Sequence, residues 1–98
     1  MAKRIIWNNI ALKIFEDIID YNTENYSEKV ASDFIKKVFD RLNILSRYPD
    51  IGRKSKKKKN VKFYKIDKHR DLYYRIDGIN LIVVYLFDTR QDPNKNPY

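Results

Sequence analysis

The side chains that could carry chemistry in this sequence are few, and most of them are basic. His69 is the only histidine, and the 98 residues include no cysteine. An imidazole ionises near neutral pH, so His69 is the natural candidate for proton transfer; the alternative is an ordinary surface histidine. Without cysteine the chain forms no disulfide and no thiolate metal site, and one histidine does not build a histidine metal site. We therefore expect no metal and no cofactor.

Positive charge is concentrated in the second half of the chain. The formal net charge is +8, and residues 1–50 hold 8 basic and 8 acidic residues, so the whole excess falls in residues 51–98. Residues 51–70 contain 10 basic residues and one acid, Asp67. Such a segment attracts a polyanion, although a run of lysines can also be a solvated loop. The candidate nucleic-acid or partner-binding residues are Arg53, Lys56, Lys57, Lys58, Lys59, Lys65 and Arg75.

Length and hydropathy limit the class of protein. Ninety-eight residues, 43% of them hydrophobic, form one domain with a modest core. The longest apolar run, Leu81–Phe87, is far shorter than the roughly 20 residues that span a bilayer, and the N-terminus lacks the apolar stretch of a signal peptide. We expect a single domain over residues 1–98, no membrane contact and a cytoplasmic location.

Two amphipathic helices are predicted in the first half, after a short strand at Lys3–Trp7. Asn8 is a good N-cap, and apolar residues then recur at helical spacing from about Ile10 to Asn22. Ser27 can cap a second helix, which Tyr48-Pro49 ends because the residue before proline disfavours helical geometry. The short link predicts an antiparallel hairpin. Its expected core residues are Ile14, Ile18, Val30, Phe34, Val38 and Leu42.

In the second half the apolar period changes from about 3.6 to 2, which is typical of strands. A loop over residues 50–60 precedes predicted strands at Val61–Ile66 and Leu72–Ile76, and Asp77-Gly78 predicts a hairpin turn with positive φ at both residues. Leu81–Phe87 is apolar on both faces, as in a central strand covered by helices. Residues 88–98 form a C-terminal tail or capping loop.

Three segments of the second half carry a resemblance to a known family. They are Tyr48-Pro49-Asp50-Ile51-Gly52-Arg53, Lys68-His69-Arg70-Asp71-Leu72-Tyr73-Tyr74-Arg75-Ile76, and Leu86-Phe87-Asp88-Thr89-Arg90-Gln91-Asp92-Pro93. In this order and at this chain length, they resemble the RelE/ParE toxins of bacterial type II toxin–antitoxin systems. The resemblance covers nearly the whole chain, because the strand, helix, helix, strand, strand, strand order also fits.

The resemblance implies a fold, a partner and a biological effect. The fold is α+β, with a helical hairpin packed on one face of a twisted antiparallel sheet whose other face is partly open. The partner is a cognate antitoxin that wraps and neutralises the toxin, and such pairs inhibit growth and stabilise plasmids. The lysines of Lys56–Lys59 then have a third interpretation, as the surface that receives acidic side chains of the antitoxin.

The family has two branches with different targets. RelE-like members cut messenger RNA on the ribosome, whereas ParE-like members poison DNA gyrase. Metal-independent RNA cleavage needs a base, an acid and cations that stabilise the phosphorane. Arg70 matches the arginine that RelE-like nucleases place against the scissile phosphate, Arg90 resembles a second family arginine, and Lys65 aligns loosely with a basic residue beside that site. The alternative for each is a solvated basic side chain.

One departure from the nuclease pattern favours the ParE-like branch. Many RelE-like nucleases carry a tyrosine or a His-Tyr pair near the C-terminus, but Tyr98 is the only tyrosine of the tail here. We therefore predict a ParE-like inhibitor of DNA gyrase. The alternatives are a ribosome-dependent endoribonuclease that uses Arg70, Arg90 and His69, and a non-toxic basic nucleic-acid-binding module. Whether the protein is an enzyme is left open by the sequence.

Overall fold

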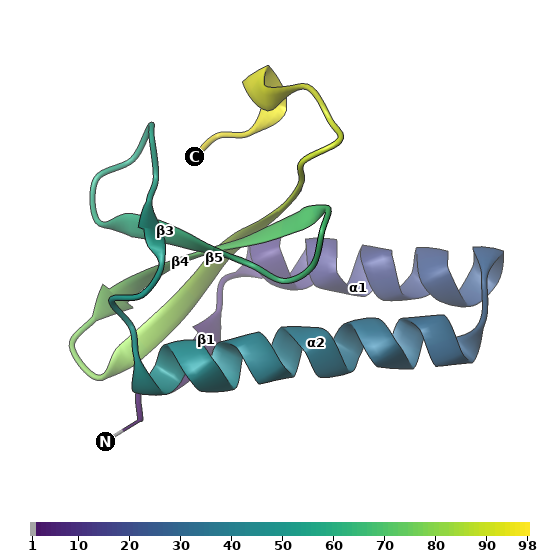
Figure 1. The fold of residues 1–98 in the computed structure, drawn as a ribbon, viewed down its shortest axis with the longest axis horizontal. Coiled ribbons are helices and arrows are strands. Elements are labelled where there is room, and N and C mark those ends of the chain that lie inside the picture. The colour runs from purple at the N-terminus through teal and green to yellow at the C-terminus, as the bar shows by residue number, and fades with distance from the viewer. Residues whose placement is uncertain (1) are drawn as a thin grey trace.

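The computed structural model, which describes residues 2–98, places two antiparallel helices on one face of a five-stranded sheet (Figure 1). The helices are α1 (Asn9–Asn25) and α2 (Glu28–Arg47). The strands are β1 (Arg4–Trp7), β2 (Arg53–Lys54), β3 (Val61–Lys65), β4 (Arg70–Asp77) and β5 (Asn80–Asp88), and a 3₁₀ turn follows at Pro93–Lys95. The α+β prediction and the order of its main elements are confirmed. No helix within residues 2–98 is both long and apolar enough to cross a membrane.

The sheet is mixed, so the expectation of a wholly antiparallel sheet is wrong. Its strand order is β1-β5-β4-β3-β2, and β1 pairs with β5 in parallel, from Arg4 opposite Asn80 to Trp7 opposite Val83. β5 uses one edge to pair with β4, and β1 covers the other edge, which would otherwise expose unpaired backbone groups. β2, which lies inside the predicted loop at 50–60, pairs with β3 at the far edge.

Both predicted helix caps are present. The Asn8 side chain accepts a hydrogen bond from the Ala11 amide at 2.8 Å, and the Ser27 hydroxyl accepts one from Val30 at 3.1 Å. Phe34, Val38 and Leu42 are buried as expected, but Val30 is 41% exposed. It lies in the first turn of α2, where the helical hairpin extends beyond the sheet and has no strand to cover it (Figure 1).

The hairpin between β4 and β5 turns one residue later than predicted. Its two turn residues are Gly78 and Ile79, and Asp77 is the last residue of β4, opposite Asn80. Gly78 has a φ of 59°, whereas the φ of Asp77 is not positive. A single positive φ at the first turn residue is the pattern of a type II′ turn, which requires glycine there and accepts Ile79 next.

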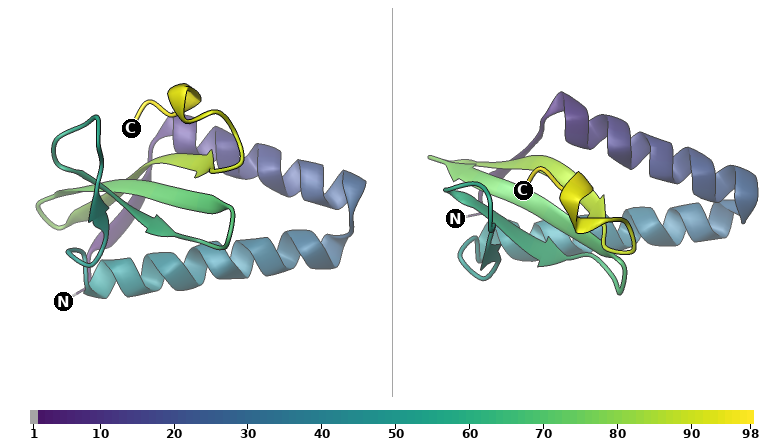
Figure 2. Two further views of the ribbon diagram at one scale, coloured as in Figure 1. Left: turned by 45° about the horizontal axis from the view of Figure 1, so that its top comes forward. Right: turned by 90° about the horizontal axis from the view of Figure 1, so that it is seen from above.

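The main core fills the space between the helices and the sheet, and a smaller one lies on the opposite face. Apolar side chains of both helices pack there against Ile66, Leu72, Tyr74, Leu81, Val83 and Leu86. The second face carries Val61, Tyr73, Val84 and Phe87, against which Tyr85 and Tyr98 pack. β5 is therefore covered by helices on one face only. The C-terminal segment folds back over its second face (Figure 2).

A buried tyrosine anchors the turn that leads from α2 into the sheet. The Tyr74 side chain is fully buried, and its hydroxyl donates to the Pro49 carbonyl at 2.6 Å and accepts from the Gly52 amide at 3.2 Å. A Cβ at Gly52 would overlap the Tyr74 hydroxyl and lie 3.0 Å from the Phe63 carbonyl oxygen. Burial and the contact with the Gly52 backbone shift the pKa of Tyr74 in opposite directions, and burial, the larger effect, raises it.

Replacing Tyr74 by phenylalanine tests this anchor. The Tyr74→Phe variant leaves the Pro49 carbonyl and the Gly52 amide without a partner, so we expect the free energy of unfolding to fall by about 1–3 kcal/mol. Urea denaturation followed by circular dichroism measures the change. The control is Tyr48→Phe, whose side chain is 62% exposed and which should change stability by less than about 0.5 kcal/mol. Equal stability of the two variants would contradict this role for the Tyr74 hydroxyl.

Candidate functional site

Three residues singled out from the sequence meet in one open pocket of about 440 Å³. His69, Arg70 and Arg90 line it on the sheet side, where β4 begins and β5 has just ended. The end of the helical hairpin lines the opposite side with Tyr21, Asn22, Tyr26, Val30, Asp33, Phe34 and Lys37. The pairing of β4 with β5 brings the two arginines together, because Arg70 lies directly opposite Asp88 in the ladder.

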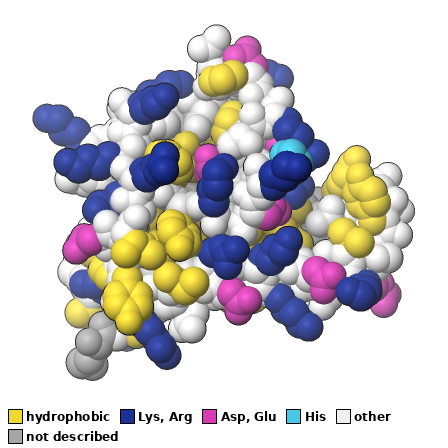
Figure 3. All heavy atoms as spheres, in the orientation of Figure 1, with side chains coloured by type: hydrophobic (Ala, Val, Ile, Leu, Met, Phe, Trp, Pro, Cys, Tyr) yellow, Lys and Arg dark blue, Asp and Glu magenta, His cyan; other side chains and the backbone are white. Residues whose placement is uncertain are grey.

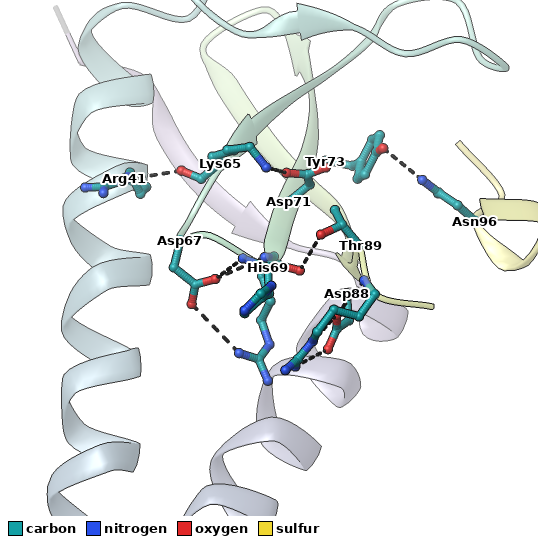
Figure 4. A network of polar contacts seen from close by, with 11 residues as sticks. Arg41, Lys65, Asp67, His69, Asp71, Tyr73, Asp88, Thr89 and Asn96 are labelled. Atoms are coloured by element: carbon teal, nitrogen blue, oxygen red, sulfur yellow. Dashed lines mark hydrogen bonds and ion pairs between the residues drawn. The ribbon is translucent and has the colours of Figure 1, made fainter. Parts of the chain in front are cut away.

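Asp67 holds the backbone turn that carries His69 and leads into β4 at Arg70. One oxygen of its carboxylate accepts hydrogen bonds from the His69 amide at 2.8 Å and the Arg70 amide at 3.0 Å (Figure 4). Its second oxygen lies 3.8 Å from Nη1 of Arg70. The Arg70 guanidinium also lies over the Phe34 ring, 5.2 Å from the centroid. With only 19% of its side chain exposed, Arg70 is held by both an anion and an aromatic face.

Asp88 holds the turn that follows β5 in the same way. Its Oδ1 accepts from the Arg90 amide at 2.9 Å, and its two oxygens bind the Arg90 guanidinium at 3.0 and 2.6 Å. Because these hydrogen bonds favour the ionised form, they lower the pKa of Asp88 from 3.8 to about 2, and they raise the pKa of Arg90. Thr89 links these two turns, because its amide and its hydroxyl both donate to the His69 carbonyl (Figure 4).

The charges of this pocket limit what it can do chemically. Arg70 faces Asp67 and Arg90 faces Asp88, so each guanidinium already has an anionic partner. An incoming phosphate would have to compete with a bidentate carboxylate for Arg90. His69 carries the only imidazole of the pocket, so proton transfer would depend on it. The pocket therefore suits binding of a partner more directly than cleavage of a phosphodiester.

The tail tyrosine lies away from this pocket. Tyr98 stacks on Tyr73 at 5.6 Å between ring centroids and packs against Tyr85 at 5.7 Å. Tyr73 belongs to the second face of the sheet, whereas Arg70 lies over Phe34 of α2 on the helical face. Tyr98 therefore does not join Arg70 and Arg90.

The remaining predicted residues fall into separate places. Lys65 pairs with the buried Asp71 at 3.4 Å and shares a small depression with Arg53, Phe63 and Tyr64 on the outer strands. Lys56–Lys59 surround a second depression at the loop between β2 and β3. Arg75 lines a third with Lys59 and Lys62. Figure 3 shows dark blue basic side chains gathered over the upper left of the molecule, where that loop lies in Figure 1.

Sequence reasoning missed the acids and the tyrosines of the pocket. Asp67 and Asp88 each accept a hydrogen bond from the amide two residues further on, as in an Asx turn. This spacing of an aspartate before the basic residue is visible in the sequence. Tyr21 and Tyr26 contact each other edge to face at 6.1 Å and are 55% and 66% exposed. No sequence signal links them to Arg70, because the link depends on how far the hairpin reaches over the sheet. Within residues 2–98 no cluster of ligating side chains could hold a metal ion.

An Arg90→Gln variant tests the coupling of Arg90 to Asp88. Loss of the guanidinium should raise the pKa of Asp88 from about 2 toward 3.8. Because the folded-state pKa lies below the unfolded value, the stabilisation from ionised Asp88 is present above about pH 4 and lost as the pH falls through 2. Carbon-detected NMR titration of the carboxyl groups measures this, with Arg75→Gln as the control. The coupling is disproved if Asp88 titrates alike in both variants.

Known proteins match this chain in both sequence pattern and fold. The family model of the ParE toxin of the type II toxin–antitoxin system parDE matches residues 5–93. A structure of the chromosomal ParDE toxin–antitoxin system from P. aeruginosa is similar, with a TM-score of 0.74 and 13% identity over 89% of this chain and 96% of that one. No curated protein sequence matches significantly.

Two further solved structures share the fold. The YoeB/ParE toxin from Agrobacterium tumefaciens has a TM-score of 0.65 and 14% identity over 87% of this chain and 96% of that one. The YoeB dimer from Staphylococcus aureus has a TM-score of 0.64 and 15% identity over 89% and 97% of the two chains. The match of the family model over residues 5–93, with which the shared fold agrees, shows that the chain belongs to the ParE toxin family of type II toxin–antitoxin systems.

Proposed function

We propose that this protein is a cytoplasmic toxin that inhibits the DNA gyrase of its host and is neutralised by a cognate antitoxin. The observation that carries the gyrase assignment is the pairing of both pocket arginines with carboxylates of the same chain. A ribonuclease needs its cations free to stabilise a phosphorane, whereas a binding surface does not. The position of Tyr98 on the opposite face supports the same assignment, because the tail tyrosine does not reach the pocket.

Family membership supports the antitoxin partner, since toxins of this family are encoded in pairs. The P. aeruginosa structure described above is that of a chromosomal ParDE toxin–antitoxin system. In this proposal the antitoxin blocks the surface that meets gyrase, so co-expressed antitoxin restores growth. Co-expression of the adjacent reading frame is the direct measurement of that rescue.

A second candidate is favoured by one observation. His69, Arg70 and Arg90 share a single pocket, which is the arrangement that a RelE-like endoribonuclease would need. In that case His69 would move the proton, while Arg70 and Arg90 would leave their carboxylates to stabilise the developing charge. The protein would then cut messenger RNA on the ribosome rather than stop supercoiling.

Purified components separate the two candidates. We expect the toxin to abolish supercoiling of relaxed plasmid by gyrase and to leave messenger RNA intact in a translation reaction analysed by primer extension. In cells, induction without antitoxin should arrest growth with filamentation and a DNA damage response. Cut transcripts with normal supercoiling would contradict the gyrase proposal, and normal growth would point to the non-toxic nucleic-acid-binding alternative.

The variant Arg70→Gln sharpens this comparison. It removes the charge and keeps part of the side-chain stem over Phe34, so the fold should persist, as thermal melting can check. Under the gyrase proposal, which assigns Arg70 no chemical step, we expect at most a few-fold loss of inhibition. Under the nuclease alternative, loss of one transition-state cation should reduce cleavage by about 10²–10³-fold. Loss of messenger RNA cleavage by about this factor, with supercoiling by gyrase unaffected by parent and variant alike, would favour the nuclease.

A further inference from the structure

The loop between β2 and β3 carries a dense run of lysines, and the pocket described above does not use it. Its depression, of about 550 Å³, is lined by Lys54, Ser55, Lys56, Lys57, Lys58, Lys59, Asn60, Val61 and Lys62. We call this set the lysine loop. Among the residues that line it there are six lysines and no acid.

Most of these charges have no anionic partner within the described chain. Lys62 lies 3.7 Å from Asp50, and the ion pairs of residues 2–98 include no other member of the lysine loop. The pairing of β2 with β3 even sets Lys54 directly opposite Lys62. Like charges directly opposite each other in a ladder are destabilising, so this arrangement does not serve stability. The contrast with Arg70 and Arg90, each paired with a carboxylate, is plain.

The backbone of the loop is held in shape by the C-terminal segment. The Ser55 hydroxyl donates to the Tyr98 carbonyl and accepts from the amides of Lys57 and Lys58 at 3.3 Å. The Lys57 amide also donates to the Tyr98 carbonyl at 3.2 Å. The Tyr98 ring is stacked on Tyr73 of the sheet. A run of lysines that would repel itself in a free loop is thereby fixed to the folded core.

The chemistry of the loop distinguishes among polyanions. It offers ammonium groups, which contact phosphates as point charges, and no arginine fork for reading base edges. Single-stranded nucleic acid binds best where exposed aromatic rings stack on its bases, and the loop lining contains none. The neighbouring rings of Tyr73 and Tyr98 are engaged with each other. These features fit the regular phosphate backbone of a duplex, which carries about one charge per 1.7 Å.

We propose that the lysine loop is a sequence-independent contact for the phosphate backbone of duplex DNA, on a surface separate from the arginine pocket. The inference rests on the proposed function at one point only, namely that the proposed target, gyrase, works on duplex DNA. A toxin with this contact meets its target while the target holds DNA, and the lysine loop adds affinity from the DNA itself. The arginine pocket is then left for the protein partner.

Direct binding to DNA tests the loop without gyrase. Fluorescence anisotropy of a short labelled duplex is measured across a salt series with the full chain. The double variant Lys56→Glu, Lys58→Glu should bind at least about tenfold more weakly and lower the slope of log affinity against log salt by about 2. The matched control, Lys13→Glu, Lys36→Glu, makes the same change of net charge on exposed positions of the helices. It should bind within about twofold of the parent protein.

A charge-neutral variant separates a shaped surface from general attraction. Ser55→Ala keeps every lysine and removes the hydroxyl that joins Tyr98 to Lys57 and Lys58, so we expect affinity for the duplex to fall about threefold. Equal losses in the loop and helix double variants would overturn the proposal, as would an unchanged affinity in Ser55→Ala. Unchanged affinity in the loop double variant would overturn it as well. Since no gyrase is present, these results are independent of the supercoiling test.

Discussion

The antiparallel ladder between β4 and β5 is the constraint on which the rest of the structure depends. It runs from the turn at Gly78 to the pair of Arg70 with Asp88, with one irregularity at Tyr73 and Tyr74. Residues opposite each other in the ladder share a face of the sheet, so this register places the turn at His69 beside the turn at Arg90. A slip of one residue would turn each apolar side chain to the wrong face and separate Arg70 from Asp88.

The irregularity in that ladder decides which face the end of β5 presents. Tyr73 lies opposite Tyr85 and Tyr74 opposite Val83, so Val84 is the extra residue of a bulge. Before the bulge Leu81 and Val83 face the helices, and after it Leu86 does. Phe87 and Tyr85 are thereby moved to the second face. Without the bulge, Asp88 would point away from Arg70, and the pocket would lose Arg90, which Asp88 binds.

The protein treats its two groups of cations in opposite ways. At the arginine pocket each guanidinium is matched by a carboxylate two or three residues before it, which fixes its direction and reduces its charge. At the lysine loop the lysines other than Lys62 are exposed, and the one ion pair of the loop within residues 2–98 joins Lys62 to Asp50. Paired arginines give a rigid, shaped surface suited to a protein partner, whereas unpaired lysines give a field suited to a polyanion. The second face of the sheet, closed by Tyr98, connects the loop to the core.

The sequence by itself determined the two helices, four of the five strands and the distribution of charge. Asn8 and Ser27 cap the helices because their side-chain oxygens bind amides three residues on, which is a local interaction. The change of apolar period located the strands, the chemistry of the imidazole singled out His69, and the family resemblance supplied Arg70 and Arg90. Tertiary structure alone decided the parallel pairing of β1, the exposure of Val30 and the bulge at Val84. Each of these depends on where distant segments meet, and neither spacing nor composition encodes which edge, end or face of the sheet a distant segment reaches.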